Sequence, residues 1–290
     1  MFFKIDIKLT SLLPVPQTIY SKGTLLDLSK PIVMGILNAT PNSFYNKGKD
    51  GDMDSLLRNA DKMLNDGATI LDIGGASTKP GSHLMNPNEE LINVLPVVEA
   101  IHKRFPDTWL SIDTYNAVVA KDAVEAGVKI VNDISSGKFD AKMLETVAAL
   151  KVPYIAMHIQ GEPLNMQINP LYTNIVEEII DYLRLTCQTA TDAGIKDIII
   201  DPGFGFGKTV THNFNLLNSL KAFRIIGKPI LVGLSRKSMI CKPLKMNPEN
   251  ALNGTTILNT IAVLQGAVIL RVHDVKEAVE VVKLAEYISL

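Results

Sequence analysis

The sequence contains little cysteine and no long apolar run, and both absences narrow what the protein can be. Cys187 and Cys241 are its only cysteines in 290 residues, and their spacing fits neither a zinc site nor a disulfide framework. We interpret both as structural thiols in a reducing compartment. No apolar run is long enough to span a membrane. Lys4, Asp6 and Lys8 interrupt the apolar N-terminus, which argues against a signal peptide, so we predict a cytoplasmic protein.

An excess of charge of one sign is missing as well. The formal net charge is −1, which gives no general attraction to nucleic acid or to an anionic membrane, so we expect neither as a partner. Any anionic ligand must therefore be bound by a local cluster of cations. The hydrophobic fraction of 47% is that of an ordinary globular protein with a large core.

Eight short apolar runs alternate with stretches of helical periodicity from Pro31 onward. The runs predict buried parallel strands at residues 32–37, 69–74, 109–113, 129–133, 154–158, 197–201, 230–234 and 268–272. Eight such units favour a closed (β/α)8 barrel, the TIM barrel, over an open doubly wound sheet. We predict one barrel domain at residues 31–290, since no linker or low-complexity segment divides them. In residues 1–30, FKIDIKL followed by TLLDL predicts a hairpin that caps the bottom of the barrel.

Polar side chains follow the predicted strands, at the rim where barrels of this class carry their chemistry. They are Asn38 and Thr40; Asp72, Ser77, Thr78 and Lys79; Asp113; Asn132 and Asp133; Met157 and His158; Asp201; Ser235, Arg236 and Lys237; and Arg271 and His273. A single Asn or Asp there is more often a turn former or a helix cap, and Asp133 and Asp274 fit that role best. So many polar groups at one rim are costly to bury unless they bind a ligand.

The charges divide between two sides of this rim. Acidic and amide groups follow the third, fourth and sixth strands, while Lys237, Arg271 and His273 follow the last two. Those three side chains suit a phosphate or diphosphate, whereas the carboxylate of Asp201 can accept two parallel N–H bonds from a flat amidine-like edge. The division predicts a substrate with a planar heterocycle at one end and a phosphoryl leaving group at the other. Alternatively, Arg236, Lys237 and Arg271 form only structural ion pairs with nearby carboxylates.

The strand-end motifs resemble those of the dihydropteroate synthase family of the folate pathway. MGILNATPNSF is similar to the family's first signature and ILDIGGASTKPGS to its second, and SIDT, IVNDISSG, MHIQGEP, DPGFGFGK, VGLSRKS and RVHDV follow in the family's order. Together they span residues 31–287. The resemblance implies a barrel enzyme that joins 4-aminobenzoate to 6-hydroxymethyl-7,8-dihydropterin diphosphate, releasing diphosphate and forming 7,8-dihydropteroate. It also implies sulfonamide binding in the aminobenzoate pocket and a homodimer, for which LNGTTILNTIAVLQG offers an apolar face.

The resemblance also implies a role for each matching side chain. The pterin would be held by Asp113, Asn132, Met157, Asp201 and Lys237, and the diphosphate by Asn38, Lys79, Arg271 and His273, with Asn38 helping to place Mg²⁺. Thr78, Phe206 and Ser235 would line the aminobenzoate pocket, and the catalytic set would be Lys237, Asp113, Asp201, Arg271 and His273. An arylamine is already a nucleophile, so the main task is to stabilise the departing diphosphate electrostatically.

Three positions depart from the family pattern. Family members commonly carry TPDSF and ESTRPG, whereas this chain has Asn42 for the aspartate, Ala76 for the glutamate and Lys79 for the arginine. Lys79 keeps the positive charge but loses the bidentate fork of arginine. The first loop is also unusual, and either Asp50 or Asp52 would approach the metal. Every residue on the pterin side matches, so we predict an active enzyme.

Two rival hypotheses remain at this point. A pterin-binding methyltransferase barrel, which passes a methyl group from methyltetrahydrofolate to a corrinoid protein, shares pterin recognition but needs neither the cations of GLSRKS and RVHD nor a metal-binding Asn38. A non-catalytic pterin-binding relative would account for the changes at Asn42, Ala76 and Lys79. Product formation by the purified protein distinguishes the second rival from an enzyme.

Overall fold

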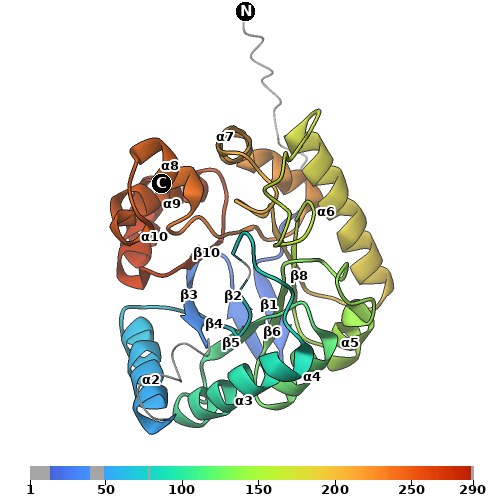
Figure 1. The fold of residues 1–290 in the computed structure, drawn as a ribbon, viewed down its shortest axis with the longest axis vertical. Helices are drawn as coiled ribbons and strands as arrows, with labels where there is room; N and C mark the ends of the chain where they lie inside the picture. The colour runs from blue at the N-terminus through green and yellow to red at the C-terminus, as the bar shows by residue number, and fades with distance from the viewer. Residues whose placement is uncertain (1–13, 40–48, 78, 289–290) are drawn as a thin grey trace, which may run out of the picture.

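A ring of eight parallel strands forms the centre of the fold, and helices surround it (Figure 1). The structure, a computed structural model, describes residues 14–39, 49–77 and 79–288. Within these residues the barrel strands are β3 (Ile32–Asn38), β4 (Ile70–Gly74), β5 (Trp109–Asp113), β6 (Ile130–Asp133), β7 (Tyr154–Met157), β8 (Ile198–Asp201), β9 (Leu231–Val232) and β10 (Ile269–Val272). Each begins within one residue of its predicted start, and the predicted (β/α)8 barrel is confirmed.

The strand order proves that the ring is closed. Neighbouring strands are paired in the order β8-β7-β6-β5-β4-β3-β10-β9, and an isolated parallel bridge between Ile200 and Ile230 joins the two ends. All carboxyl ends of these strands therefore face the same side of the molecule, because every pair in the ring is parallel.

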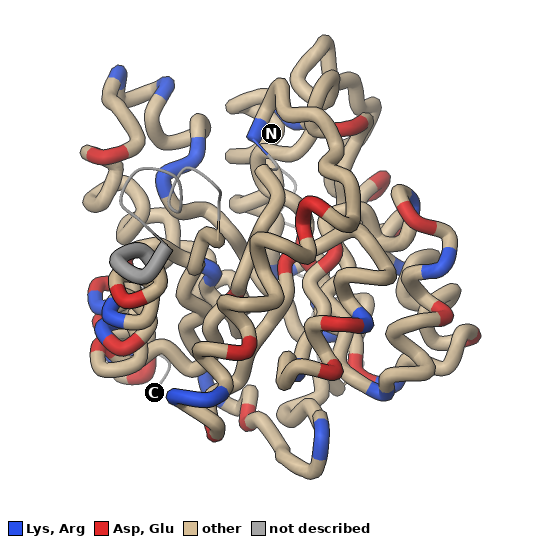
Figure 2. Tube along the Cα trace, turned by 60° about the horizontal axis from the view of Figure 1, so that its bottom comes forward, with Lys and Arg blue, Asp and Glu red and all other residues tan. Residues whose placement is uncertain are grey.

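The outer layer consists of helices that bury one apolar face against the strands. They are α2 (Lys49–Asn65), α3 (Pro87–Arg104), α4 (Ala117–Glu125), α5 (Met143–Leu150), α6 (Ile175–Asp192), α7 (Val210–Asn218), α8 (Ser238–Leu244), α9 (Leu252–Leu264) and α10 (Val275–Ile288), with short 3-10 turns η1 (Leu220–Ile226) and η2 (Pro248–Asn250). Several begin at capping side chains: Asn86, Asn174 and Thr209 each accept a backbone N–H of the first turn. Acidic and basic residues are interspersed along this layer (Figure 2).

Two apolar layers hold the barrel together. The larger layer fills the space between the strands and the helices; it includes Leu71, Leu110 and Val131 of the strands and Val97 and Val124 of the helices. The smaller layer lies inside the ring and consists of Met34, Ile70, Trp109, Ile130, Ile155, Ile199, Leu231 and Ile269, one from each strand. Ile19, Leu26 and Leu28 from the N-terminal segment pack against this inner layer and close the amino end of the barrel.

The N-terminal hairpin exists, but its first strand differs from the predicted one. It pairs β1 (Thr18–Ser21) with β2 (Thr24–Asp27), and the second of these lies in the predicted TLLDL segment. FKIDIKL lies outside the described residues. Lys22 and Gly23 both have positive φ, 47° and 82°, as the two central residues of a type I′ hairpin turn require. A two-residue turn ending in glycine was the signal for β1 in the sequence.

No helix in the three described ranges combines the length and the apolar character that crossing a bilayer requires.

Candidate active site

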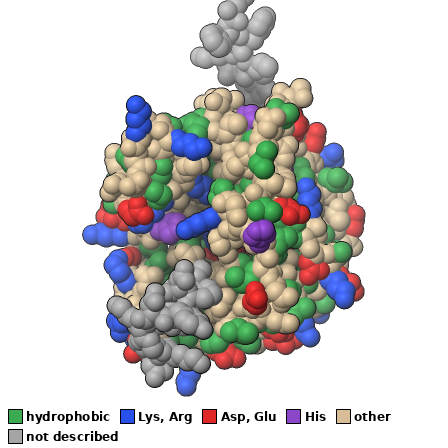
Figure 3. Space-filling model, viewed as in Figure 1, with side chains coloured by type: hydrophobic (Ala, Val, Ile, Leu, Met, Phe, Trp, Pro, Cys, Tyr) green, Lys and Arg blue, Asp and Glu red, His purple; other side chains and the backbone are tan. Residues whose placement is uncertain are grey.

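The strand-end side chains gather at the carboxyl end of the barrel. Figure 3 shows Lys, Arg and His side chains around the centre of the face that it views. Arg271 on β10 lies at the middle of this group, because its Nε donates to Oδ2 of Asp72 at 2.6 Å and its Nη2 donates to Oδ2 of Asp113 at 2.5 Å. Nδ2 of Asn132 donates to the same Asp72 oxygen at 3.1 Å. Four strands thus meet in one hydrogen-bonded network.

Asp72 is a residue of this network to which sequence reasoning gave no ligand role. It is fully buried, and its second oxygen, Oδ1, has no hydrogen-bond partner among the described residues. A buried carboxylate oxygen without a donor is costly, so it marks a place where a ligand donor fits. The signal was present in the sequence, since Asp72 interrupts the apolar run ILDIG near its carboxyl end.

Asp113 has the most perturbed acid–base behaviour of the network. Burial raises the pKa of its carboxyl to about 7, while the adjacent guanidinium of Arg271 opposes this rise and the charges of Asp72, Glu90 and Asp133 add to it. Asp113 therefore changes its protonation state near neutral pH, where a ligand N–H would compete with a proton for the same oxygens.

Lys237 lies beside an aromatic ring and feels the charge of a nearby carboxylate. Its Nζ donates to the carbonyl oxygen of Phe204 and lies 4.7 Å from the centre of the Phe206 ring. Burial lowers the pKa of Lys237 to about 8, and the charge of Asp201 opposes this fall. Asp201 is itself buried at the end of β8, and its Oδ1 accepts the backbone N–H of Gly203 at 2.7 Å. The predicted residues Asp201, Phe206 and Lys237 are thus brought together.

An apolar wall lies beside these charged groups. Met157 belongs to a small buried cluster with Tyr115, Ile134, Ile159 and Met166, and Ala76, Phe139 and Phe206 pack against it. An apolar wall beside a few fixed polar groups is the usual lining of a site for a flat organic ligand. Ala76, one of the departures from the family pattern, contributes to this wall.

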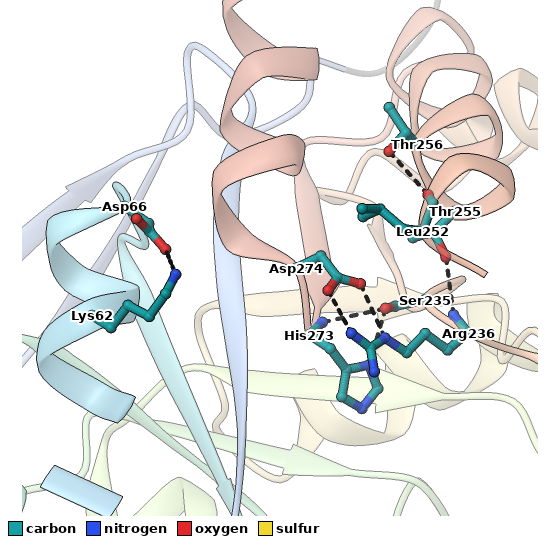
Figure 4. Close-up of polar contacts among 9 residues, drawn as sticks. All are labelled: Lys62, Asp66, Ser235, Arg236, Leu252, Thr255, Thr256, His273 and Asp274. Carbon is teal, nitrogen blue, oxygen red and sulfur yellow. Dashed lines mark hydrogen bonds and ion pairs between the residues drawn. The ribbon is translucent and has the colours of Figure 1, made fainter. Parts of the chain in front are cut away.

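Ser235 and His273 are in direct contact. Oγ of Ser235 lies 3.0 Å from Nδ1 of His273, and it also accepts the backbone N–H of His273 at 3.3 Å (Figure 4). Burial, reinforced by the charges of Arg236 and Arg271, lowers the pKa of His273 to about 4. At neutral pH the imidazole is therefore uncharged and can offer a hydrogen bond but not a full positive charge.

The alternative of structural ion pairs holds for Arg236. Its Nε and Nη2 donate to the two carboxylate oxygens of Asp274 at 3.1 and 2.6 Å (Figure 4). Asp274 stands at the start of α10, where its backbone carbonyl accepts the N–H of Ala278 at 3.2 Å, while both of its carboxylate oxygens bind the guanidinium. Asp133 does form a turn, since it accepts N–H bonds from Ser135 and Gly137 and the hydroxyl of Tyr154.

The remaining predicted residues lie toward the outside of the rim. Asn38 ends β3 next to Gly74 with an exposed side chain, and Lys79 is also exposed. Thr78, Thr40 and Asn42 lie outside the described residues, as do the side chains of Asp50 and Asp52. The described part of the chain contains no group of three or more His, Cys, Asp or Glu side chains that could hold a metal ion. Magnesium usually takes few protein ligands and completes its shell with water and phosphate, so the amide oxygen of Asn38 fits this mode.

Comparisons with known proteins show which family the chain resembles. A family model described as "Pterin binding enzyme" matches residues 34–273. The dihydropteroate synthase of Haemophilus influenzae is 44% identical over 268 residues, which cover 92% of this chain and 97% of that protein. The Yersinia pestis dihydropteroate synthase with a sulfonamide drug superposes with a TM-score of 0.88 at 43% identity, over 94% of this chain and 99% of that one. The Xanthomonas albilineans enzyme with 4-aminobenzoic acid gives 0.87 at 35% identity, over 94% and 98%.

Proposed function

The chain belongs to the pterin-binding enzyme family, and on that premise we propose how its rim residues carry out the dihydropteroate synthase reaction. That reaction joins 4-aminobenzoate to 6-hydroxymethyl-7,8-dihydropterin diphosphate and yields 7,8-dihydropteroate and diphosphate, so the enzyme is a transferase with small-molecule substrates. The carbon–oxygen bond to diphosphate breaks with its electron pair leaving on oxygen. The amine nitrogen then bonds to the freed methylene carbon and loses one proton.

The pterin end is assigned to the network around Asp72 and Arg271. The carboxylates of Asp113 and Asp201 and the amide of Asn132 offer acceptors for the N–H edge of the heterocycle, while Met157 belongs to the apolar wall against its flat face. The buried, unpaired oxygen of Asp72 is the single observation that carries this assignment. Positive charge that develops on the methylene carbon would be stabilised by these carboxylates in a site of low dielectric constant.

The aminobenzoate end is assigned to Phe206, Ser235 and Thr78. Support comes from Lys237, whose Nζ lies 4.7 Å from the centre of the Phe206 ring and interacts electrostatically with Asp201 on the pterin side. An ammonium in that place orients both substrates, so that the arylamine lies close to the methylene carbon when the diphosphate leaves. Arylamines need no general base to become nucleophilic, and Lys237 therefore acts through position and charge.

The diphosphate end is assigned to Asn38, Lys79, Arg271 and His273. Arg271 and Lys79 supply positive charge, and His273, which is neutral at neutral pH, supplies an N–H. Mg²⁺ held by the amide oxygen of Asn38 would neutralise charge on the leaving group when bound. Arg271 also orients Asp72 and Asp113, so one guanidinium connects leaving-group binding with pterin binding.

We also propose that the enzyme is a homodimer. Ile257, Ile261 and Leu264 on α9 are 51, 38 and 49% exposed, and Leu284 and Tyr287 on the adjacent α10 are 66 and 78% exposed. Such a face is larger than the single exposed apolar residues of ordinary surfaces. Light scattering should give twice the chain mass for the wild type and the single chain mass for the I257D/I261D variant. A wild-type monomer at micromolar concentration would contradict the dimer.

The experiment that tests the assignment is diphosphate release by the purified protein. We expect release only when dihydropterin diphosphate, 4-aminobenzoate and Mg²⁺ are all present, together with formation of dihydropteroate. Asp72→Asn, which keeps the size of the side chain but changes its acceptors, should weaken pterin binding. Pterin binding without release of diphosphate would favour the non-catalytic alternative. Unchanged pterin affinity in Asp72→Asn would rule out the unpaired Asp72 oxygen as an acceptor for the pterin.

A further inference from the structure

Lys208, at the end of the loop that follows β8, is a buried lysine that the reaction does not use directly. It is 2% exposed. Its Nζ lies 2.7 Å from the carbonyl oxygen of Gly203, 2.9 Å from that of Phe206 and 3.0 Å from Nδ1 of His158, with the His158 carbonyl oxygen at 3.3 Å. The contacts of the amine thus join the loop after β8 to the end of β7.

The two connected segments are pressed against each other without intervening side chains. A Cβ on Gly203 would clash with the carbonyl oxygen of His158, and a Cβ on Gly207 would lie 2.5 Å from the carbonyl oxygen of Gln160. Both glycines also have positive φ, 70° and 64°. Three backbone carbonyl oxygens converge on the Lys208 amine: those of His158 and Phe206, and that of Gly203, which also accepts the N–H of Phe206. Backbone carbonyls in so close a contact need donors, and Lys208 supplies one to each of the three.

His158 is fixed on its other side by aromatic rings. Its imidazole meets the Tyr182 ring edge-on at 4.8 Å between centroids, and the Tyr172 ring lies at 6.1 Å. The hydroxyl of Tyr172 donates to the carbonyl oxygen of Gly207 at 2.8 Å, which ties this group back to the same loop. Burial, with the neighbouring charges of Lys208 and Lys138, lowers the pKa of His158, so the ring stays neutral over the physiological range.

The loop held in this way carries the groups that place the second substrate. The carbonyl of Phe204 binds Lys237, the ring of Phe206 lies beside the same ammonium, and Asp201 immediately precedes the loop. Any shift of the loop moves these groups together. The connection from Lys208 to the substrates therefore passes through the backbone of residues 203–206.

We propose that Lys208 is a positioning residue for aminobenzoate: by fastening the loop after β8 to His158, it fixes the ring of Phe206 and the ammonium of Lys237 at the distance that the second substrate requires. The inference rests on the proposed placement of aminobenzoate beside Phe206. Lys208 itself touches neither substrate. Its effect on the pterin is smaller, because Asp72, Asp113 and Asn132 come from other strands and Asp201 alone of the pterin-side carboxylates adjoins this loop.

The test compares Lys208→Met, which keeps the length and apolar stem of the side chain, with Lys196→Met, an exposed lysine just before β8. Lys208→Met leaves the carbonyl oxygens around Nζ without this donor, so we expect KM for 4-aminobenzoate to rise about tenfold. The Kd of a dihydropterin ligand should change less than about threefold. Lys196→Met should match the wild type in both. Equal weakening of both substrates, or of neither, would overturn the inference.

A second pair of variants decides the matter if Lys208→Met does not fold. His158→Asn keeps a polar atom near the position of Nδ1, whereas His158→Leu removes it. We expect aminobenzoate KM to rise in His158→Leu and to return toward the wild-type value in His158→Asn. Equal KM values in these two variants would contradict the role of the contact.

Phe206→Ala separates failure of this inference from failure of the proposed pocket. An unchanged aminobenzoate KM in Phe206→Ala would mean that aminobenzoate binds elsewhere. Both the proposed pocket and the role of Lys208 would then be wrong. A raised KM in Phe206→Ala together with a wild-type KM in Lys208→Met would leave the pocket standing and overturn the role of Lys208 alone.

Discussion

Arg271 donates through Nη2 to Asp113 at 2.5 Å, although 158 positions separate the two residues in the chain. The contact exists because closure of the ring pairs β10 with β3. Only β3 and β4 then lie between β10, which carries Arg271, and β5, which carries Asp113. Arg271 reaches across this end of the barrel, with Asp72 on its other nitrogen, so its guanidinium holds two carboxylates of the candidate pterin site in fixed orientations. The ion pairs of Arg271, which the sequence left as a structural alternative, thus lie within the candidate site.

Removal of Arg271 should destabilise the fold as well as the site. Arg271→Met leaves the buried carboxylates of Asp72 and Asp113 without their cation, and we expect a loss of about 3 kcal/mol in the free energy of unfolding. Urea denaturation measures this loss. Lys30→Met breaks the exposed pair with Glu286 and should change the free energy by less than about 0.5 kcal/mol. Equal losses in the two variants would contradict the importance of burial.

Pterin binding should weaken as the pH is lowered through 7. Asp113, whose pKa is raised to about 7, must be ionised to accept N–H bonds, so affinity should fall about tenfold per pH unit below that value. The effect of this raised pKa on the stability of the fold runs in the opposite direction. The folded protein binds the Asp113 proton more tightly than the unfolded chain, so this group contributes most to stability below about pH 4 and loses that contribution as the pH rises toward 7. Calorimetry from pH 5.5 to 8 tests the affinity, and Asp113→Asn should show weaker binding without this dependence.

Lys237→Ala should abolish turnover and leave the fold intact. The ammonium lies beside Phe206 and interacts electrostatically with Asp201, and removal of a charge that positions both substrates should lower kcat/KM by a factor of about 100 or more. Steady-state kinetics with circular dichroism as a folding control measure the effect. Near-normal turnover would refute the role given to Lys237.

Sulfonamides should compete with 4-aminobenzoate. The expectation follows from the shared pocket that we assign to Phe206, Ser235 and Thr78. Initial rates at several concentrations of both compounds should show that excess aminobenzoate restores the uninhibited rate. Inhibition that does not depend on the aminobenzoate concentration would contradict the pocket.

Lys79→Arg should improve binding of the diphosphate substrate. Arginine supplies the planar fork that matches two phosphate oxygens, whereas lysine supplies a single point charge, so we expect KM for dihydropterin diphosphate to fall about threefold. Lys103→Arg, on the outer helix α3, serves as a control in which KM stays the same. A KM that Lys79→Arg leaves unchanged or raises would remove Lys79 from the diphosphate site.

The sequence predicted the barrel well because buried parallel strands are continuous apolar runs with a polar residue at the end. β1 was missed since TIYS shows only four residues of weak alternation, and the turn at Lys22 and Gly23 was its main signal. The sequence left open an ion pair for Arg236 but did not single out Asp274 as its partner, since the two residues lie 38 positions apart in the chain. Spacing likewise gave no hint that Asp72 would take both Arg271 and Asn132 as partners.

The short strand β9 makes one side of the ring weaker than the rest. It comprises only Leu231 and Val232, and a single bridge between Ile200 and Ile230 joins it to β8. Asp201 ends β8 and Lys237 follows β9, so the two residues lie on either side of this weakly paired junction between β8 and β9. A pterin bound to both residues would connect the two strands and stabilise their junction. Backbone amides along β8 and β9 would then exchange their hydrogens more slowly in the pterin-bound enzyme than in the free enzyme.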